Sequence, residues 1–272
     1  MRAQTLGRSY DFGDIVRIPE GARIMVVSDI HGNYEDFNKY IDIWENAGKD
    51  THIIFLGDLI HGINTKTDKS LDILLDAYAY DKSDNFHILM GNHEWYQIHD
   101  KPIYKMGMNQ SEDFRKYLRD HMTIEIMYEF METFKKFAVT PNGLFICHAG
   151  PSHYMGHLLN EINSGLSLSP IFHQDDIDNA FESMVFARPT SFYSDDGYTQ
   201  YDVESFLKKI NMKIMISGHT PVNGWQTVGN QLIFDSSFAT ENKYYLSMMS
   251  DEPINDICDV INNLVPLGVK NE

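Results

Sequence analysis

Five short apolar runs, each followed at once by residues able to bind a metal ion, constrain this 272-residue chain more than any other feature. The runs are residues 24–27, 53–56, 88–90, 144–146 and 214–216. Short apolar runs of this kind, rich in β-branched residues, predict strands that are buried on both faces. Further strands are predicted at residues 232–234 and 244–249. We therefore expect a buried sheet with polar residues at its strand ends.

Segments with helical periodicity lie between the strand runs, because their apolar residues recur every three or four positions. Helices are predicted for residues 34–47, 68–80, 111–137 and 202–210. Ser111 is a suitable N-cap for the longest of them. Residues 150–200 contain several prolines and mixed polarity, and we expect short helices and loops there, over the active face. Strands alternating with helices indicate an α/β fold.

The domain organisation is predicted from the absence of any linker-like stretch, which favours one folded unit. We divide the chain into an N-terminal extension (1–20), a central domain (21–250) and a C-terminal tail (251–272). The apolar spacing within the tail fits a helix docked on the domain. A partner-binding segment is the alternative.

The formal net charge of −17 argues against a partner held by contacts with a nucleic-acid backbone, because such contacts need a basic face. The two cysteines, Cys147 and Cys258, cannot form a disulfide framework in a chain of this length, which favours a reducing compartment. No secretory signal and no apolar run of about 18 residues is recognisable. We therefore expect a cytoplasmic protein without membrane contact.

The residues that follow the five strand runs form one constellation. They are Asp29, His31 and Asn33 after the first run, Asp58 after the second, Asn92, His93 and Glu94 after the third, His148 after the fourth and His219 after the fifth. Ligands in open α/β sheets bind at the carboxyl ends of the strands, so these loops can converge on one point. Each piece alone is more often a turn or a core histidine. The ordered set predicts a metal site.

A mixture of imidazole and carboxylate ligands suits borderline divalent metals, so we expect manganese, with iron and zinc as alternatives. A carboxylate at a shared position can bridge two ions about 3.5–4 Å apart. Water between two such ions becomes a hydroxide nucleophile near neutral pH. The constellation therefore predicts two divalent cations and a hydrolytic reaction.

At these residues the chain resembles the calcineurin-like metallophosphoesterases. The resemblance is strongest to the phosphoprotein-phosphatase (serine/threonine phosphatase) branch and its bacterial and archaeal relatives, which include diadenosine tetraphosphatases. The matching segments are residues 29–33, 57–58, 91–94, 145–152, 186–189 and 218–222. The resemblance spans about residues 22 to 249. It implies a four-layer α/β/β/α sandwich of two mixed sheets flanked by helices, with the metals at one edge.

The resemblance also implies a role for each matching residue. Asp29 and His31 would bind the first metal, Asn92, His148 and His219 the second, and Asp58 both. His93 would be the general acid that protonates the leaving-group oxygen, a task that suits a histidine's pKa. Arg188 would clamp the phosphate, since its planar fork matches two oxygens at once; a surface salt bridge is the alternative.

One motif departs from the family pattern, which usually reads Gly-Asp-x-x-Asp-Arg-Gly. Residues 57–63 read Gly-Asp-Leu-Ile-His-Gly-Ile. His61 stands where an aspartate normally orients the general acid, and Gly62 where an arginine normally binds phosphate. His61 either contacts the substrate directly or fills space in the loop. Lys66 or Lys69 could replace the lost positive charge.

Three functions compete on this sequence. We expect hydrolysis of phosphomonoesters, on phosphoserine or phosphothreonine in a phosphoprotein. Hydrolysis of a nucleotide such as a dinucleoside polyphosphate is the alternative. A metal-binding scaffold without turnover is the third, and His93 argues against it because a scaffold needs no general acid. The sequence carries no signal of the oligomeric state.

Overall fold

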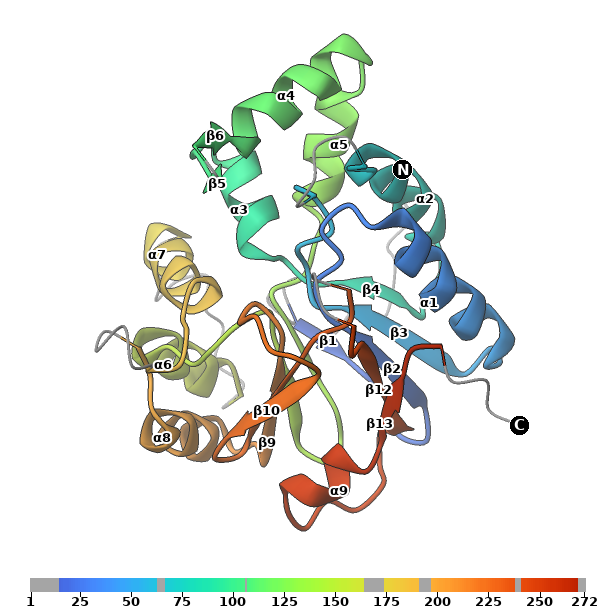
Figure 1. Ribbon diagram of the computed structural model, residues 1–272. Coiled ribbons are helices and arrows are strands. Elements are labelled where there is room, and N and C mark those ends of the chain that lie inside the picture. Colours follow the sequence, from blue (N-terminus) through green and yellow to red (C-terminus); the bar gives the residue numbers. More distant parts are fainter. Residues whose placement is uncertain are drawn as a thin grey trace, which may run out of the picture.

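The computed structural model describes residues 15–62, 67–105, 107–163, 174–190, 197–237 and 241–268. Two mixed sheets stack at the centre, with helices on both outer sides (Figure 1). This arrangement confirms the predicted four-layer α/β/β/α sandwich. Among the described residues, no helix combines the length and the apolarity that a bilayer crossing requires.

The larger sheet has six strands. In spatial order they are β1 (Ile15–Arg17), β7 (Phe137–Val139), β8 (Leu144–Ile146), β9 (Ile214–Ser217), β11 (Gln231–Phe234) and β10 (Trp225–Val228). Strands β8, β9 and β11 run parallel, whereas β10 is antiparallel to β11 and β7 is antiparallel to β8. The parallel strands therefore end at the same edge.

The smaller central sheet has five strands. In spatial order they are β13 (Leu264–Pro266), β12 (Tyr244–Met249), β2 (Arg23–Val27), β3 (Thr51–Phe55) and β4 (Phe86–Ile88). Strands β2, β3 and β4 are parallel, and β12 is antiparallel to β2. Val27 lies opposite Phe55, which in turn lies opposite Ile88, so the three parallel strands end level with one another.

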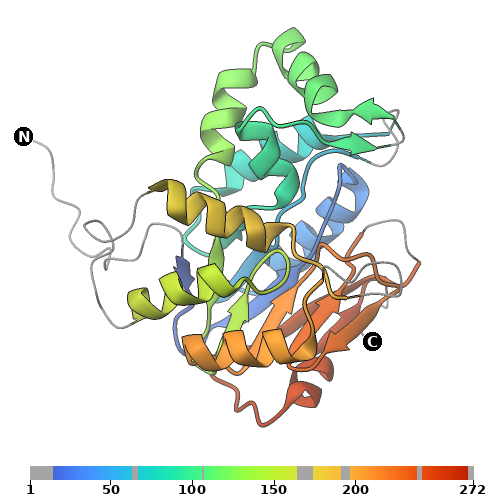
Figure 2. The same cartoon turned by 90° about the vertical axis from the view of Figure 1, so that its left-hand side faces the viewer.

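Helices cover the outer faces of both sheets. Beside the five-stranded sheet are α1 (Tyr34–Asn46) and α2 (Ser70–Tyr80). Over the six-stranded sheet are α6 (His153–Asn163), α7 (Gln174–Val185) and α8 (Gln200–Ile210), which lie side by side in Figure 2. Above the sandwich in Figure 1 are α3 (Asn92–Ile98), the hairpin of β5 (Tyr104–Lys105) and β6 (Met108–Asn109), α4 (Gln110–Asp120) and α5 (Ile124–Met131), and below it is α9 (Ile257–Ile261).

The strand side chains alternate between two cores because successive residues point to opposite faces. Ile24 and Val26 of β2 belong to the core between the two sheets, together with Ile146 of the facing sheet. Met25 and Val27 instead belong to the core shared with the helices. Burial on both faces explains why these strands are continuous apolar runs.

Four segments differ from their predicted secondary structure. The strand predicted for residues 88–90 lies two residues earlier, as β4, and Leu89 forms only an isolated bridge with Lys135. The single helix predicted for residues 111–137 is wrong: the chain leaves α4 through Met122, whose φ is +53°, and forms α5 as a separate helix. The described part of the segment expected as an extension contributes β1, which pairs with β7. In the tail, α9 buries Val260 as a docked helix would, but it is short and is followed by β13, which pairs with β12.

Candidate metal centre

The loops that follow β2, β3, β4, β8 and β9 meet at one edge of the sandwich, where the parallel strands of both sheets end. They bring together all six predicted ligands, namely Asp29, His31, Asp58, Asn92, His148 and His219, and all six are buried. Residues up to 190 positions apart in the sequence are in contact there, since the backbone N–H of His219 donates to Asp29 Oδ1 at 3.0 Å.

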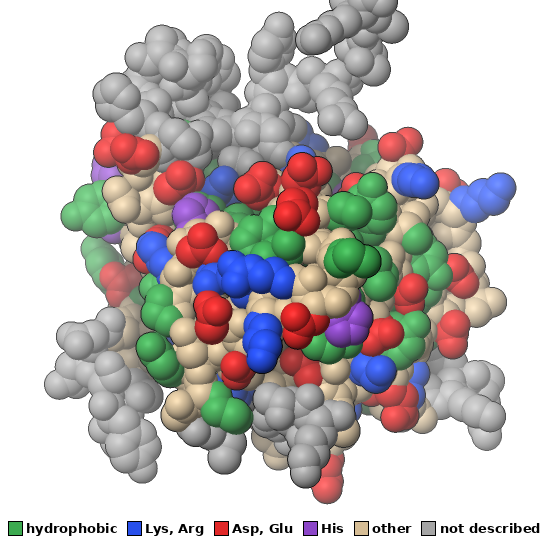
Figure 3. All heavy atoms as spheres, turned by 90° about the horizontal axis from the view of Figure 1, so that it is seen from above, with side chains coloured by type: hydrophobic (Ala, Val, Ile, Leu, Met, Phe, Trp, Pro, Cys, Tyr) green, Lys and Arg blue, Asp and Glu red, His purple; other side chains and the backbone are tan. Residues whose placement is uncertain are grey.

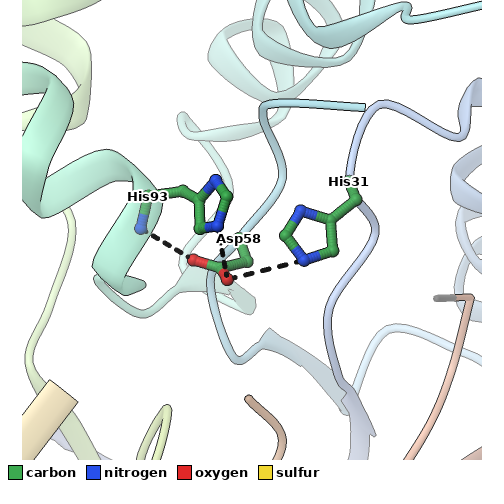
Figure 4. Close-up of side chains that lie close together, drawn as sticks. All are labelled: His31, Asp58 and His93. Carbon is green, nitrogen blue, oxygen red and sulfur yellow. Dashed lines mark hydrogen bonds and ion pairs between the residues drawn. The ribbon is translucent and has the colours of Figure 1, made fainter. Parts of the chain in front are cut away.

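The first group of donors surrounds one oxygen of Asp58. His31 Nε2 lies 3.6 Å from Asp58 Oδ2 and 3.8 Å from Asp29 Oδ2. His93 Nε2 lies 3.9 Å from the same Asp58 oxygen, and its backbone N–H donates to Asp58 Oδ1 at 3.0 Å (Figure 4). The two imidazole rings approach the carboxylate from different elements, His93 from the start of α3 and His31 from the loop after β2.

The second group of donors gathers around His148. Its Nε2 atom lies 3.6 Å from Asp58 Oδ2, 3.0 Å from Asn92 Oδ1 and 3.2 Å from His219 Nδ1. Asp58 Oδ2 is therefore shared by both groups, which is the position expected of a bridging carboxylate between two cations.

Backbone carbonyl groups set the orientation of two of these histidines. His31 Nδ1 lies 3.2 Å from the carbonyl oxygen of Ile60, and His148 Nδ1 lies 3.0 Å from that of Leu56. A neutral ring that donates from Nδ1 presents a bare Nε2 to the cluster. His148 Nε2 and Asn92 Oδ1 then meet as two acceptors, an arrangement that a cation between them satisfies. The donor set thus fits a pair of divalent metal ions.

Burial shifts the pKa values of these groups in the directions that metal binding exploits. Burial raises the pKa of Asp58 well above its usual range, and the charges of Asp29 and Glu94 add to the effect. Burial lowers the pKa of His31 to about 4 and also lowers that of His148. The histidines are therefore neutral, as metal ligands must be. The closely spaced carboxylates of Asp58, Asp29 and Glu94 repel one another, and a cation beside them would relieve this repulsion.

The backbone is strained where the site residues sit. His31, Asp58, His61 and His219 have φ values of +46°, +52°, +64° and +62°. Residues with a Cβ rarely adopt this left-handed region, and each instance costs on the order of 1–2 kcal/mol. Strain of this kind concentrates at functional sites, where the surrounding structure enforces it.

Glu94 holds the loop that carries Asp58. Its fully buried carboxylate accepts backbone N–H groups from Asp58 at 2.8 Å, Leu59 at 2.7 Å and Ile60 at 3.3 Å. Gly57 makes the close packing possible, because a Cβ there would lie 2.3 Å from the backbone nitrogen of Gly91. The sequence motif showed Glu94 as part of a pattern, but this anchoring role is visible only in the fold.

Residues 22–223 match the family model described as calcineurin-like phosphoesterase. The chain belongs to this family. It is therefore a metallophosphoesterase, as its sequence motifs predicted. The typical dinuclear centre of the family agrees with the two clusters of donor atoms that share Asp58.

Solved structures with the same fold include protein phosphatases. A serine/threonine protein phosphatase from Saccharomyces cerevisiae has a TM-score of 0.59 and 16% identity, over 93% of this chain and 82% of that one. A cold-active protein-tyrosine phosphatase from Shewanella has a TM-score of 0.57 and 17% identity, over 88% of this chain and 78% of that one. At this level of identity, the likeness supports the metallophosphoesterase fold.

The metal centre of this metallophosphoesterase opens into a cavity of about 300 Å³. His93 and Arg188 line it beside the predicted metal ligands. Arg188 is exposed, and its Nε lies 3.2 Å from His219 Nε2. The structure thus brings the predicted phosphate clamp to the rim of the predicted metal site.

Lys105 is a second cation on the cavity wall that the sequence analysis missed. It belongs to the hairpin of β5 and β6, 43 positions beyond Gly62, where the family's arginine is missing. Burial lowers the pKa of its ammonium group, while the charges of Asp58 and Asp29 raise it, so the group lies within electrostatic range of both carboxylates. The sequence could not identify this residue, because a single lysine in a short hairpin is not part of any recognisable motif.

Of the two lysines suggested from sequence, the structure describes only Lys69. Lys66 lies outside the described residues. The Lys69 side chain instead forms an exposed ion pair with Asp72, 3.5 Å away. Figure 3 shows Lys and Arg side chains interspersed with Asp and Glu over the upper face.

His61 lies behind the site and is not part of the cavity lining. It is 1% exposed, and its Nδ1 lies 2.9 Å from His93 Nδ1. Its Nε2 lies 3.0 Å from Gln97 Oε1. Both ring nitrogens therefore have protein partners, which differs from the expectation that His61 contacts the substrate directly.

A larger cavity of about 1370 Å³ adjoins the metal centre. Arg188 and Thr220 line both cavities. Tyr198, Lys208 and Lys209 line the larger one, in which α6, α7 and α8 form the walls. The larger cavity therefore leaves room for a bulky group beside the candidate metal centre.

Proposed function

We propose that this metallophosphoesterase is a phosphatase that hydrolyses phosphomonoesters of serine or threonine in phosphoproteins, at a centre of two divalent cations. The observation that carries the proposal is the sharing of Asp58 Oδ2 by two groups of donor atoms. A phosphate positioned over such a centre is open to in-line attack.

The residues divide the metal-binding task as follows. Asp29 and His31 would hold the first cation, Asn92, His148 and His219 the second, and Asp58 both. When bound, the cations supply Lewis acidity and an activated water. Manganese suits the mixed imidazole, amide and carboxylate donors, with iron or zinc as alternatives. The free cysteines, Cys147 and Cys258, fit a reducing compartment, and we assign the enzyme to the cytoplasm.

His93 is the general acid in this proposal. Its side chain is 12% exposed and lines the cavity, so its Nε2 is accessible to a bound ester while it remains beside Asp58. Burial lowers the pKa of this ring well below its usual range in the metal-free protein. In the proposal the ring, once protonated, donates its Nε2 proton to the ester oxygen as the phosphorus–oxygen bond breaks. The leaving group thus departs as an alcohol rather than as an alkoxide.

Arg188 and Lys105 bind the phosphate oxygens. Arg188 offers a planar fork, and Lys105 a single charged donor. The hairpin that carries Lys105 is tied to the altered motif, because Gln110 Nε2 at its end donates to the carbonyl oxygen of Gly62 at 3.0 Å. Lys105 therefore offers, from a different segment, the positive charge that the family's arginine supplies at the position of Gly62.

The test is turnover by metal-stripped protein to which manganese is added back, first with p-nitrophenyl phosphate and then with a phosphoserine peptide. The wild type should be active only with metal. His93→Ala should keep two bound metals and lose on the order of 10²–10⁴ in rate on the peptide. Bound metal without turnover on either substrate would overturn the proposal, and loss of metal in the variant would make His93 a ligand instead.

A dinucleoside polyphosphate is the second candidate substrate, and the larger cavity favours it. A nucleoside moiety needs space beyond the scissile phosphate, and Lys208 and Lys209 offer positive charge to further phosphates there. Comparing kcat/KM for the phosphoserine peptide and for diadenosine tetraphosphate decides between the candidates. A preference for the dinucleotide by more than about tenfold, equivalent to 1.4 kcal/mol, would replace the first assignment.

A further inference from the structure

A chain of side-chain hydrogen bonds runs from the general acid into the protein interior. His93 Nδ1 lies 2.9 Å from His61 Nδ1, and His61 Nε2 lies 3.0 Å from Gln97 Oε1. Gln97 Nε2 donates to the hydroxyl of Tyr128 at 2.7 Å. His61 stands at the motif position where an aspartate is usual in the family. In this protein a histidine, and not a carboxylate, therefore contacts His93 from behind.

The amide of Gln97 determines which group donates and which accepts in this series of hydrogen bonds. Because its nitrogen donates to Tyr128, its oxygen faces His61 and accepts a hydrogen bond there. A neutral imidazole has one donor and one acceptor nitrogen. His61 therefore carries its proton on Nε2 and accepts at Nδ1. His93 in turn donates its Nδ1 proton to His61 and directs Nε2 into the cavity.

The His61 ring has little freedom to adopt another arrangement. Its backbone N–H donates to Ser70 Oγ at 2.9 Å, and its ring packs edge-on against Phe114 with the centroids 5.5 Å apart. Burial lowers the pKa of His61 to about 3, so the ring is neutral at physiological pH. The left-handed backbone, with φ at +64°, turns the side chain toward His93.

We propose that His61, itself held by Gln97, is the positioning residue that orients the His93 ring and fixes its tautomer. A neutral acceptor here replaces the carboxylate of the related enzymes. His93 gives its Nε2 proton to the ester oxygen as the phosphorus–oxygen bond breaks, and the neutral ring keeps its Nδ1 proton bonded to His61. The inference rests on the proposed role of His93.

This role predicts that the effect of His61 depends on the leaving group. An alkoxide from a serine ester needs a proton as it departs, and a misoriented acid therefore slows that reaction. The p-nitrophenolate ion is a stable anion that departs without one. A residue that merely supports the fold would affect both substrates equally.

The first experiment compares wild type and His61→Gly on a phosphoserine peptide and on p-nitrophenyl phosphate. Glycine accepts the left-handed backbone, so the change removes the ring without adding strain. We expect kcat on the peptide to fall by about 10²-fold and kcat on the aryl ester by less than about threefold, at unchanged metal content. His61→Asp, which restores an acceptor and tolerates this backbone, should recover the peptide rate to within about tenfold of wild type.

Gln97 provides a matched pair of variants. Gln97→Glu keeps an acceptor facing His61 and should retain the peptide rate. Gln97→Leu removes that acceptor and should reproduce the substrate-dependent loss of His61→Gly. Equal losses on both substrates, or no loss on either, would overturn the positioning role. A wild type without metal-dependent turnover on either substrate would instead overturn the proposed function itself.

Discussion

The Glu94 carboxylate accepts the backbone N–H of Asp58 at 2.8 Å, so one buried acid fixes the loop of another. Asp58 is the residue whose oxygen faces both groups of metal donors. The geometry of the shared carboxylate is therefore set from behind by α3, the same helix that carries Asn92 and His93 at its start. Changes behind the site should consequently alter metal binding without touching a ligand.

Glu94→Gln should weaken metal binding by about 10- to 100-fold, the range typical of residues that orient metal ligands. Glutamine places an NH₂ group against a backbone N–H, and the buried pocket gives that clash no solvent to relieve it. Manganese titration by calorimetry measures the effect. Glu129→Gln, at an exposed position on α5, is the control and should bind manganese like wild type. Equal affinity in both variants would contradict the anchoring role.

Asp58→Asn should remove activity and release both metals, because its carboxylate is proposed to touch both. Asparagine tolerates the left-handed backbone at this position, so the loss reports on the charge rather than on strain. Asp29→Asn should weaken the first metal and spare the second. Metal content per chain after gel filtration distinguishes the two variants. Full activity in Asp58→Asn would remove the bridging assignment.

Lys105→Met should raise KM for p-nitrophenyl phosphate by on the order of tenfold and weaken inhibition by inorganic phosphate in parallel, because a charge-assisted contact is lost. Lys105→Arg should retain most of the affinity. Lys116→Met, on the exposed face of α4, removes an equal charge away from the cavity and serves as the control. If Lys105→Met and Lys116→Met have the same KM, Lys105 does not bind phosphate.

The predicted strands β8, β9 and β11 are buried throughout, and burial on both faces demands a continuous apolar run. The strand β10 was missed because three of its four residues are exposed, and β1 because it lies in a segment of polar composition. The break at Met122 was missed because residues on both sides of it have helical periodicity. Its positive φ follows from tertiary packing, which a local pattern does not contain.

The candidate site could be predicted where its residues follow strands, because the strand ends fix their position in the fold. The position of His61 could not be predicted. Whether its ring faces His93 or the cavity depends on its backbone φ angle, which the sequence motif does not reveal. Lys105 reaches the site through a hairpin whose path depends on the packing of α3 and α4. Residues directly after a strand can thus be placed from the sequence, whereas residues farther along a loop cannot.

A pair of histidines away from the metal centre should make the stability of the enzyme depend on pH. His52 Nδ1 and His87 Nε2 lie 2.9 Å apart on neighbouring strands, with their rings stacked. Burial, together with the nearby His52 and Lys135, lowers the pKa of His87 to about 3, and burial also lowers the pKa of His52. The fold therefore favours the neutral rings.

The sign of the effect follows from linkage. The unfolded chain protonates His87 near its ordinary pKa of 6.5, whereas the folded chain resists protonation until about pH 3. The contribution of neutral His87 to the free energy of unfolding is thus fully present above pH 6.5 and is lost as the pH falls toward 3. Between pH 7 and pH 5, His87 should cost the metal-free protein on the order of 1 kcal/mol of unfolding free energy. Urea unfolding at the two pH values should show a smaller decrease for His87→Gln than for wild type, because glutamine does not titrate; equal decreases would mean that His87 is not the group responsible.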